Sequence, residues 1–501
     1  MDLSLLGIDI GTTGTKAIAF NENGDIITTS YSEYDFVFPN PGWVEFDVTS
    51  MWEKIFSVIQ KINSSEKVKK DPVTALSVST IGESFTPVDK KGNTLYNTIY
   101  STDTRSVKEL EYILTKISAK DLYSITGLTP SFIAALNKIL WVKNNLPSIY
   151  LKTKKILFTE DLLFHKLGII DTKIDYSLCS RTLFFDIRAK KWSSKILDEC
   201  DLDINLFSEP YPSGYEIGYV NNEIAKLLGF KKKVSVVTGG HDQPCAALGV
   251  GAIESGIASD GMGTVECIAT ATDKLIINNK LLRNGFPIQI HVVNNMYTTL
   301  VGILSAGSVV KWYRDVLAHE EVQEAKIKNL NVYDIIFSKL KYKPSGLYLL
   351  PYFSASGSPY WDPVPRGTIY GLSLTTKKED IFQAIVEGLV FEVALNIELL
   401  EKAGINIKEL RAVGGSAKRD YWLILKSSIL NKPIKQMDIT EAGCLATMIL
   451  AGKGTGKFSV EEAVNKFVKV NKVFYPEEEI RDKFMESFEK YKKIYGLVSK
   501  L

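Results

Sequence analysis

An apolar run that enters a bend of small residues constrains this chain more than any other feature. Residues 3–10 are almost wholly apolar and include a single acid, Asp9, and residues 11–16 read Gly-Thr-Thr-Gly-Thr-Lys. Such a bend lets backbone N–H groups and Thr hydroxyls approach a phosphate closely, and Lys16 adds positive charge. An acid at the end of a buried strand is costly unless a metal, water or a cation partners it. The segment therefore predicts a strand–loop–strand that binds a nucleotide phosphate with its magnesium.

The same pattern is also compatible with a plain hairpin. Its spacing is neither that of the eight-residue P-loop nor the GxGxxG of a dinucleotide fold. It resembles the first phosphate loop of the actin-like ATPases, and most closely that of their sugar-kinase branch.

Length and charge exclude several classes of protein. A chain of 501 residues predicts two domains of roughly 200–250 residues. A formal net charge of +2 argues against a nucleic-acid partner. No stretch approaches the ~18 apolar residues of a membrane span, and residues 1–3 do not resemble a signal peptide.

The five cysteines are far apart, odd in number and without a CxxC pair. This usage disfavours a disulfide framework or a zinc site, and it predicts a protein of the reducing cytoplasm.

Strands and helices alternate along the chain, and the pattern restarts after about residue 245. Residues 257–264 again read as a strand that ends at a Gly/Thr bend, and residues 410–416 as a strand that meets Gly-Gly-Ser. Two α/β halves, each with a Gly/Thr loop, predict two similar domains that face a cleft. We expect a first domain over residues 1–244, a second over 245–475, and a final helix over 476–501 that packs back on the first domain.

A His–Asp pair follows a predicted buried strand, residues 233–238, and two glycines. Ligands of α/β proteins bind at strand ends, and a carboxylate there can take the proton of a substrate hydroxyl, a role that contributes ~10²–10⁴ in rate. Asp242 can equally begin the helix that follows, since Pro244 occupies a first-turn position. The location at the apparent domain boundary favours catalysis, because clefts form there.

Two further segments suit a flat ligand such as adenine. Residues 414–418, Gly-Gly-Ser-Ala-Lys, precede a predicted helix over 420–430, and residues 441–448 read as a helix of small residues. A simple β–α turn and ordinary core packing explain the two segments as well.

Many motifs in a fixed order make the chain similar to the FGGY family of carbohydrate kinases over nearly its whole length. They are the phosphate loop 9–16; Lys138 to Asn145; Asp175-Tyr176-Ser177 with Ser180 and Thr182; the segment 236–251; Gly261 to Thr264; residues 304–307; residues 359–363; residues 371–388; and residues 414–418.

The resemblance implies a ribonuclease H-like (actin-like ATPase) fold in both domains, with Mg-ATP in the cleft and a sugar deep in the first domain. Asp242 matches the general base, and Asp9, together with Asp242, the acids that organise Mg²⁺. The implied ATP-binding residues are Gly11, Thr12, Thr13, Thr15, Lys16, Gly263, Thr264, Gly307, Gly414, Gly415, Ser416 and Ala417.

The implied acceptor-binding residues are Gly82, Glu83, Asp103, Arg105, His241, Asp242 and Gln243. Several depart from the patterns of known members. Xylulose kinases usually have Met-His, and glycerol kinases Arg-Glu, where this chain has Gly82-Glu83, and Ser101 stands where Trp is usual. His241 is similar to its counterpart in fuculose and rhamnulose kinases. We therefore expect a ketose of five or six carbons, xylulose-like or fuculose-like, ahead of gluconate, erythritol or glycerol.

The resemblance implies that the partners are a small sugar and ATP. We expect the protein to bind neither nucleic acid nor a membrane. A homodimer is common in the family, although no residue pattern here demands one. An actin-like ATPase without a sugar acceptor is the alternative from another class; it should lack acids equivalent to Glu83, Asp103 and Asp242.

Overall fold

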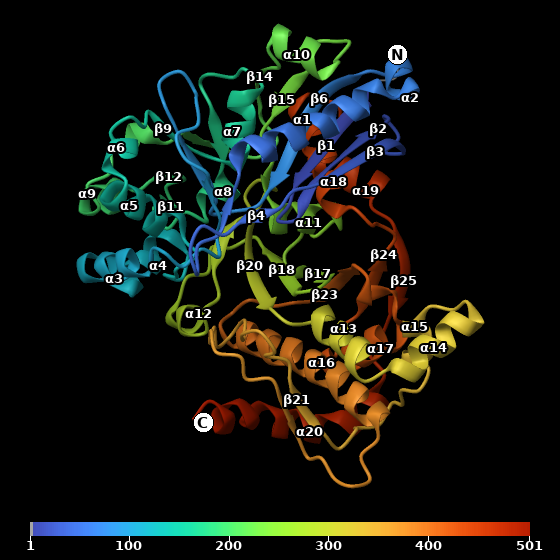
Figure 1. Ribbon diagram of the computed structural model, residues 1–501. Helices are drawn as coiled ribbons and strands as arrows, with labels where there is room; N and C mark the ends of the chain where they lie inside the picture. The colour runs from blue at the N-terminus through green and yellow to red at the C-terminus, as the bar shows by residue number, and fades with distance from the viewer. Residues whose placement is uncertain (1–3, 501) are drawn as a thin grey trace.

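The apolar run forms β1 (Ser4–Ile10), a middle strand of a seven-stranded sheet in the computed structural model, which describes residues 4–500 (Figure 1). β1 pairs antiparallel with β2 (Gly14–Phe20) and parallel with β6 (Val73–Thr80). Both neighbours and the covering helices bury β1, which is why its apolar residues need not alternate with polar ones. The other strands of this sheet are β3 (Ile26–Glu33), β14 (Glu216–Tyr219), β15 (Ser235–Val237) and β16 (Gly240–His241).

A second seven-stranded sheet repeats this arrangement around β17 (Ile257–Met262). β17 is antiparallel to β18 (Glu266–Thr272) and parallel to β23 (Glu409–Val413), just as β1 is to β2 and β6. The remaining strands are β19 (Ile288–Ile290), β20 (Tyr297–Ile303), β24 (Ile434–Met437) and β25 (Val470–Phe474). The shared order confirms the expected α/β architecture of two similar halves.

Smaller sheets are added to this frame. A five-stranded sheet beside the first large one runs in the order β4 (Phe36–Val37), β5 (Glu45–Phe46), β8 (Thr98–Ile99), β7 (Phe85–Val88) and β9 (Lys155–Phe158). The two-stranded sheets are β10 (Lys173–Asp175) with β13 (Glu209–Tyr211), β11 (Phe185–Asp186) with β12 (Lys191–Trp192), and β21 (Tyr348–Leu350) with β22 (Thr368–Tyr370).

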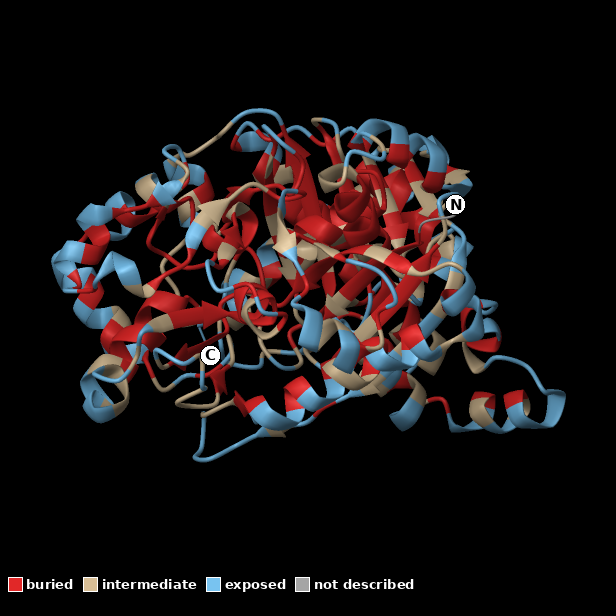
Figure 2. Ribbon diagram, turned by 90° about the horizontal axis from the view of Figure 1, so that it is seen from above, coloured by how far each residue is buried: buried red, intermediate tan, exposed pale blue. Residues whose placement is uncertain are grey.

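Helices cover the sheets and present their apolar faces to them, so that buried residues gather in the interior and exposed ones on the outer helices (Figure 2). The helices up to the His–Asp pair are α1 (Val48–Ser64), α2 (Glu66–Lys70), α3 (Val107–Lys116), α4 (Ala119–Thr126), α5 (Ala135–Asn145), α6 (Pro147–Tyr150), α7 (Thr159–Lys166), α8 (Tyr176–Cys179), α9 (Ser194–Glu199), α10 (Asn222–Leu228) and α11 (Asp242–Gly249). The later helices are α12 (Asn279–Arg283), α13 (Gly307–Val316), α14 (His319–Lys328), α15 (Val332–Phe337), α16 (Lys378–Lys402), α17 (Asp420–Leu430), α18 (Ala442–Gly454), α19 (Val460–Phe467) and α20 (Glu478–Val498).

The two halves are joined by α11 and α18, which pack on each other. α18 belongs to the second half by sequence, yet it lies on β1 and β6 of the first sheet (Figure 1). Glycines permit this approach, because a Cβ on Gly7 would lie 2.1 Å from the carbonyl oxygen of Cys444, and one on Gly249 2.0 Å from that of Ala442. The spatial halves therefore differ from a simple division of the chain near residue 245.

The last helix, α20, packs against α16 and α17 of the second half, so the expectation that it returns to the first domain was wrong. Its Tyr491 hydroxyl donates a hydrogen bond of 2.6 Å to the Glu392 carboxylate on α16, and Tyr352 donates another of 2.9 Å. Burial raises the pKa of Glu392 to about 7. Aromatic contact of Phe391 with Phe488 adds to the same interface.

The raised pKa of Glu392 predicts a pH-dependent contribution to stability. The folded protein holds this proton at pH values where the unfolded chain has lost it, so stability falls as pH rises from about 4.5 to about 7. Glu392→Gln stays neutral and still accepts from both tyrosines. We expect a Tm near that of the wild type at pH 5 and several °C higher at pH 8, for a contribution of at most ~3 kcal/mol.

Differential scanning calorimetry at the two pH values measures this effect. Glu398→Gln is the matched control on the same helix, because Glu398 pairs with Lys402 and Lys492, and these pairings lower its pKa. Equal destabilisation of Glu392→Gln at both pH values would contradict the prediction.

Candidate active site between the two halves

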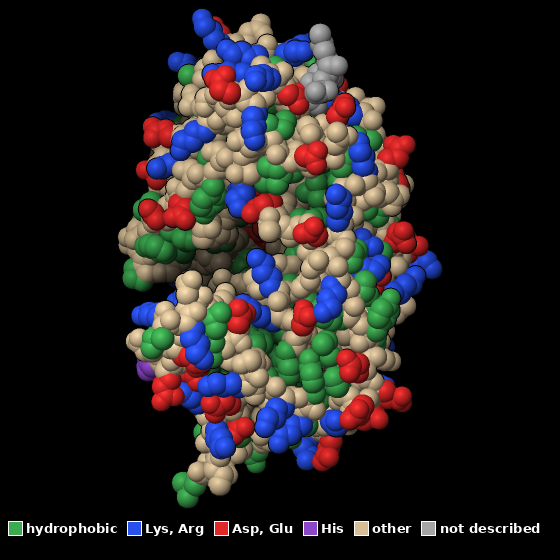
Figure 3. Space-filling view, turned by 90° about the vertical axis from the view of Figure 1, so that its right-hand side faces the viewer, with side chains coloured by type: hydrophobic (Ala, Val, Ile, Leu, Met, Phe, Trp, Pro, Cys, Tyr) green, Lys and Arg blue, Asp and Glu red, His purple; other side chains and the backbone are tan. Residues whose placement is uncertain are grey.

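A hollow lies in the molecular surface between the two lobes, as Figure 3 shows. β1 ends at Ile10 and β16 at His241 on the first side, and β17 ends at Met262 on the second. Ile10 and His241 are both in register with Thr80 of β6, so these two strand ends converge although they are far apart in sequence.

The loop between β1 and β2 is tied by tyrosines on both sides. The Tyr34 hydroxyl donates to the carbonyl of Gly11, and the Thr12 and Tyr100 hydroxyls lie 3.0 Å apart. The Gly11 N–H donates to the Gly14 carbonyl at 3.0 Å. The loop therefore has a defined shape, with Thr13 exposed at its tip.

Lys16 is engaged by an acid from the other end of the chain. Its Nζ lies 2.5 Å from Oε1 of Glu441, the residue before α18. Lys16 thus joins β2 to α18 beside the phosphate-loop candidate.

Asp9 lies at the cleft end of β1 and faces the first turn of α18. A Cβ on Gly443 would be 3.0–3.1 Å from its carboxylate, so only glycine leaves this space open. Burial raises the pKa of Asp9, and the nearby Glu441 raises it further, whereas Ser79 and Lys16 lower it. A cation bound nearby would therefore stabilise the charged form of the Asp9 carboxylate.

Asp242 occupies the first turn of α11. Burial raises its pKa to about 7, and the charges of Asp9 and Glu83 add to the rise. Its Oδ1 is buried and has no hydrogen-bond partner among residues 4–500, although His241 Nε2 lies 3.1 Å away. The sequence left open whether Asp242 only begins a helix; here it also presents an unpartnered oxygen to the cleft. Gln243 follows it in the same turn.

Gly82 and His241 fit each other in size. A Cβ on Gly82 would lie 3.0 Å from Cδ2 and 3.1 Å from Nε2 of the imidazole. Burial, with the charge of Arg181, lowers the pKa of His241 well below its ordinary value. The side chain at position 241 therefore uses the space that position 82 leaves free.

Glu83 is buried in a left-handed turn, with a φ of 59°, and forms an ion pair with Arg181. Arg181 Nε donates to Glu83 Oε1 at 2.6 Å. Sequence reasoning missed Arg181, because its partner is almost one hundred residues away in the chain.

The loop that carries Asp242 is held by buried acids and a serine. Glu160 Oε1 accepts the Gly239 N–H at 2.7 Å. Ser177 Oγ accepts the His241 N–H at 2.8 Å and donates to Asp175 Oδ1 at 2.5 Å. Ser177 and Asp175 appeared in the sequence as part of a family-like segment without a role, and no sequence signal pointed to Glu160.

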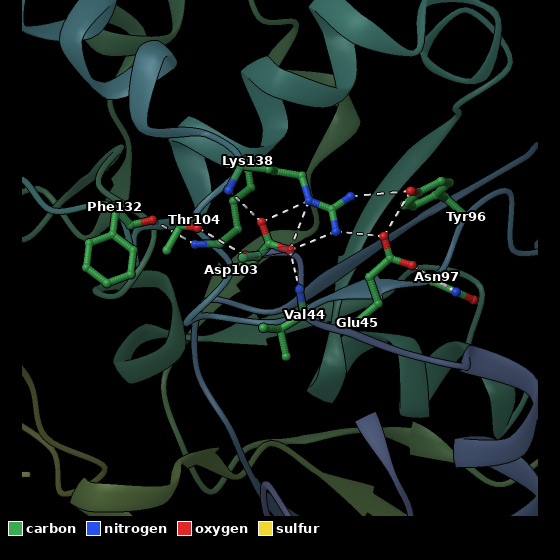
Figure 4. A network of polar contacts seen from close by, with 10 residues as sticks. Val44, Glu45, Tyr96, Asn97, Asp103, Thr104, Phe132 and Lys138 are labelled. Carbon is green, nitrogen blue, oxygen red and sulfur yellow. Dashed lines mark hydrogen bonds and ion pairs between the residues drawn. The ribbon is translucent and has the colours of Figure 1, made fainter. Parts of the chain in front are cut away.

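Asp103 and Arg105 do not reach the cleft as the acceptor-site prediction requires. Both side chains are fully buried and bind each other, with Arg105 Nε 2.8 Å from Asp103 Oδ1 (Figure 4). Asp103 also accepts the Val44 N–H at 2.6 Å, and Arg105 Nη2 lies 2.7 Å from Glu45. The polar atoms of both side chains already form hydrogen bonds or ion pairs within this network. The two residues therefore hold the surrounding loops in place instead of facing an acceptor.

Lys138 lies beside this network and binds backbone carbonyl groups of the segment that precedes α5 (Figure 4). Its Nζ donates to the carbonyls of Phe132 at 2.9 Å and Ile133 at 2.8 Å. Burial lowers its pKa to about 7, while the charges of Glu83 and Asp103 act in the other direction. The lysine of the family-like segment 138–145 therefore shapes the wall behind Glu83.

The second half contributes a cavity of about 540 Å³ at the end of β17. Its walls include Gly263, Thr264, Gly307, Gly415 and Ser416, together with Tyr333, Phe337, Arg419 and Trp422. A neighbouring cavity of about 580 Å³ includes Gly414 and Ala417. The structure thus brings together all the predicted nucleotide residues of this half.

Two glycines shape the cavity wall. Gly414 has a φ of 102° and lies so close to β17 that a Cβ would be 2.7 Å from the Met262 carbonyl. A Cβ on Gly307 would be 2.5 Å from the Gly263 carbonyl. Bare backbone beside aromatic side chains suits a flat ring that ends in anionic groups near the N-terminus of α13.

Comparison with known proteins agrees with this arrangement. The N-terminal domain model of the FGGY family of carbohydrate kinases matches residues 4–249, and the C-terminal domain model matches residues 261–454. The gluconate kinase of Lactobacillus acidophilus has a similar fold, with a TM-score of 0.89 at 22% identity over 99% of this chain and 98% of that one.

Curated relatives of different specificity are similar to the same extent. A glycerol kinase of Thermococcus gammatolerans is 29% identical over 96% of both chains. A gluconokinase of Bacillus subtilis is 27% identical over 93% of this chain and 90% of its own. A xylulose kinase of the same organism is 26% identical over 98% and 96%. These identities leave the acceptor open, but the two domain models together span most of the sequence, and the chain belongs to the FGGY family of carbohydrate kinases.

Proposed function

We propose that this kinase transfers the γ-phosphoryl group of Mg-ATP to a hydroxyl of a small ketose, with a xylulose-like sugar as the first candidate. The observation that carries the proposal is the buried, unpartnered Oδ1 of Asp242 between Asp9 and the Gly82–Glu83 turn. A buried oxygen without a partner is costly, so an incoming hydroxyl that donates to it is favoured.

Asp242 would act as the general base. A base with a pKa near the working pH combines a useful deprotonated fraction with enough basicity to accept the hydroxyl proton. Its burial, which raises the pKa to about 7, supplies that match. The developing alkoxide then attacks the γ-phosphorus in line while the bond from this phosphorus to the β–γ bridging oxygen breaks; ADP leaves, and the proton remains on the Asp242 carboxyl group.

Asp9 and Asp242 fit a magnesium ion. Mg²⁺ usually keeps several waters and binds through one or two carboxylates and substrate phosphates, so a large protein ligand set is unnecessary. Both carboxylates are partly buried with raised pKa values, so each would gain from a nearby positive charge. When bound, the ion would neutralise charge on the transferred phosphoryl group.

The nucleotide would lie with adenine against the Gly414–Ala417 segment and its phosphates between the two Gly/Thr loops. Thr12, Thr13, Thr15 and Thr264 offer hydroxyls, and the backbone at Gly11 and Gly263 offers close approach. Closure of the two halves would exclude water and limit wasteful ATP hydrolysis.

The Gly82–His241 arrangement supports a ketose over glycerol. An imidazole beside the base provides a ring nitrogen for a sugar hydroxyl, whereas the Arg-Glu pattern typical of glycerol kinases is missing at positions 82–83. A fuculose- or rhamnulose-type sugar is the second candidate, since those kinases share a histidine before the base. No helix within residues 4–500 could cross a membrane. A cytoplasmic location and a homodimer remain predictions.

Asp242→Asn should lower kcat by ~10²–10⁴ and leave ATP binding nearly unchanged, because the amide cannot accept the proton. A coupled ADP-release assay with xylulose, ribulose, fuculose, rhamnulose, gluconate, glycerol and erythritol first identifies the acceptor. Asp315→Asn, a change on the partly exposed face of α13, is the control. Full turnover by Asp242→Asn would rule out the assignment of the base.

Gly443→Ala should weaken Mg-ATP binding about tenfold or more, because the new methyl group would stand about 3 Å from the Asp9 carboxylate. Titration calorimetry with ADP, with Mg²⁺ and with EDTA, isolates the metal-dependent part. Gly496→Ala on α20 meets nothing within 4 Å and should behave as the wild type. Unchanged Mg²⁺-dependent affinity in Gly443→Ala would remove Asp9 from the metal site.

A further inference from the structure

A buried arginine with a free donor arm stands in the acceptor region. Arg181, which follows α8, is only 7% exposed. Its Nε and Nη2 both contact Glu83, whereas Nη1 is buried without a hydrogen-bond partner in the described part of the chain. Buried guanidinium donors are normally satisfied, so a free arm indicates a group that is bound only in the complex.

Unpartnered polar atoms from three separate segments converge there. His241 Nδ1, Asp242 Oδ1 and Ser84 Oγ are also buried without partners within residues 4–500. A Cβ on Gly82 would lie 3.0 Å from the His241 ring and 3.3 Å from Arg181 Cγ, so both side chains lie against the same turn. Donors and acceptors in alternation suit the hydroxyl and carbonyl oxygens of a sugar.

The charges in this region disfavour an anionic acceptor. Glu83 compensates Arg181, and Glu441 compensates Lys16. Asp9 and Asp242 add further negative charge close by. A carboxylate on the acceptor would therefore meet repulsion without a free cation to offset it.

On the basis of the proposed function, we propose that Arg181 is an acceptor-binding residue. Its Nη1, together with His241 Nδ1, hydrogen-bonds oxygens of the sugar, and the Arg181–Glu83 pair selects a neutral ketose over an aldonate such as gluconate. Arg181 thus contributes to specificity as well as to binding.

Arg181→Lys tests the binding role. Lysine can keep the ion pair with Glu83, but it has a single nitrogen and cannot place a second donor on the sugar. We expect the KM for the ketose to rise about tenfold or more, with kcat and the KM for ATP changed far less. Arg188→Lys, at an exposed arginine of the same half, is the matched control.

Glu83→Gln tests the charge selection and keeps the arginine in place. It leaves Arg181 uncompensated, so the ratio of kcat/KM for gluconate to that for the ketose should rise about tenfold. A purely structural role for the pair would lower both values together and leave the ratio unchanged. This variant decides the proposal even where Arg181→Lys does not fold.

The outcomes are distinguishable. Wild-type preference for a ketose, with both expected shifts, supports the inference. A folded Arg181→Lys protein with an unchanged ketose KM, or an unchanged ratio in Glu83→Gln, overturns it while the kinase function stands. A wild-type protein that releases ADP without dependence on any acceptor overturns the proposed function and this inference with it.

Discussion

The close approach of α18 to β1 and α11 is the contact on which the rest of the site depends. Gly7, Gly249 and Gly443 lack the side chains that would keep these elements apart, and their absent Cβ atoms would lie within about 3 Å of backbone or of Asp9. Through this contact a helix from late in the chain packs over β1 and part of β2. It brings Glu441 to Lys16 and sets the space around the Asp9 carboxylate.

Buried acids dominate the first half, and they divide into two kinds. The first kind holds loops in place, because its carboxylate oxygens accept hydrogen bonds from backbone N–H groups, hydroxyls or Arg105. These acids are Glu160, Asp175 and Asp103. Asp9 and Asp242 have raised pKa values beside the cleft, and Asp242 keeps a free oxygen. The difference lies in the available partners: burial also raises the pKa values of Glu160 and Asp175, but their oxygens are occupied by hydrogen bonds, whereas Asp242 Oδ1 is not.

Bare backbone shapes the cavity of the second half. Gly307 and Gly414 allow the loop after β17 to approach its neighbours within distances that a Cβ would forbid, and the resulting cavity has aromatic walls. Lys426 is fully buried in this half and forms ion pairs with Asp260 at 2.7 Å and Glu266 at 2.5 Å. The walls of this cavity thus combine bare backbone and aromatic rings with the basic side chains of Lys311, Lys418 and Arg419, whereas Asp9 and Asp242 lie on the side of the first half.

Local patterns in the sequence were enough to predict the two α/β halves, the strand–loop at Asp9 and the catalytic role considered for Asp242, since each depends on residues that are neighbours in the chain. The helix predicted over 420–430 begins and ends where expected. The role of Asp103 and Arg105 was not predictable in this way. Their spacing resembles an acceptor motif, but whether their polar atoms face the cleft or each other depends on Glu45 and Val44, some sixty residues earlier.

Short-range information therefore determined the family, the sheet-forming segments and the nucleotide loops, because glycines at bends and apolar runs act within a few residues. Tertiary structure decided the packing of α18 and α20, the pairing of Arg181 with Glu83 and the fit of His241 against Gly82. Each of these joins segments from about fifty to several hundred residues apart, and only the tertiary fold brings their atoms within contact distance. The acceptor preference depends on those long-range contacts, and so it is the property that the linear pattern defined least.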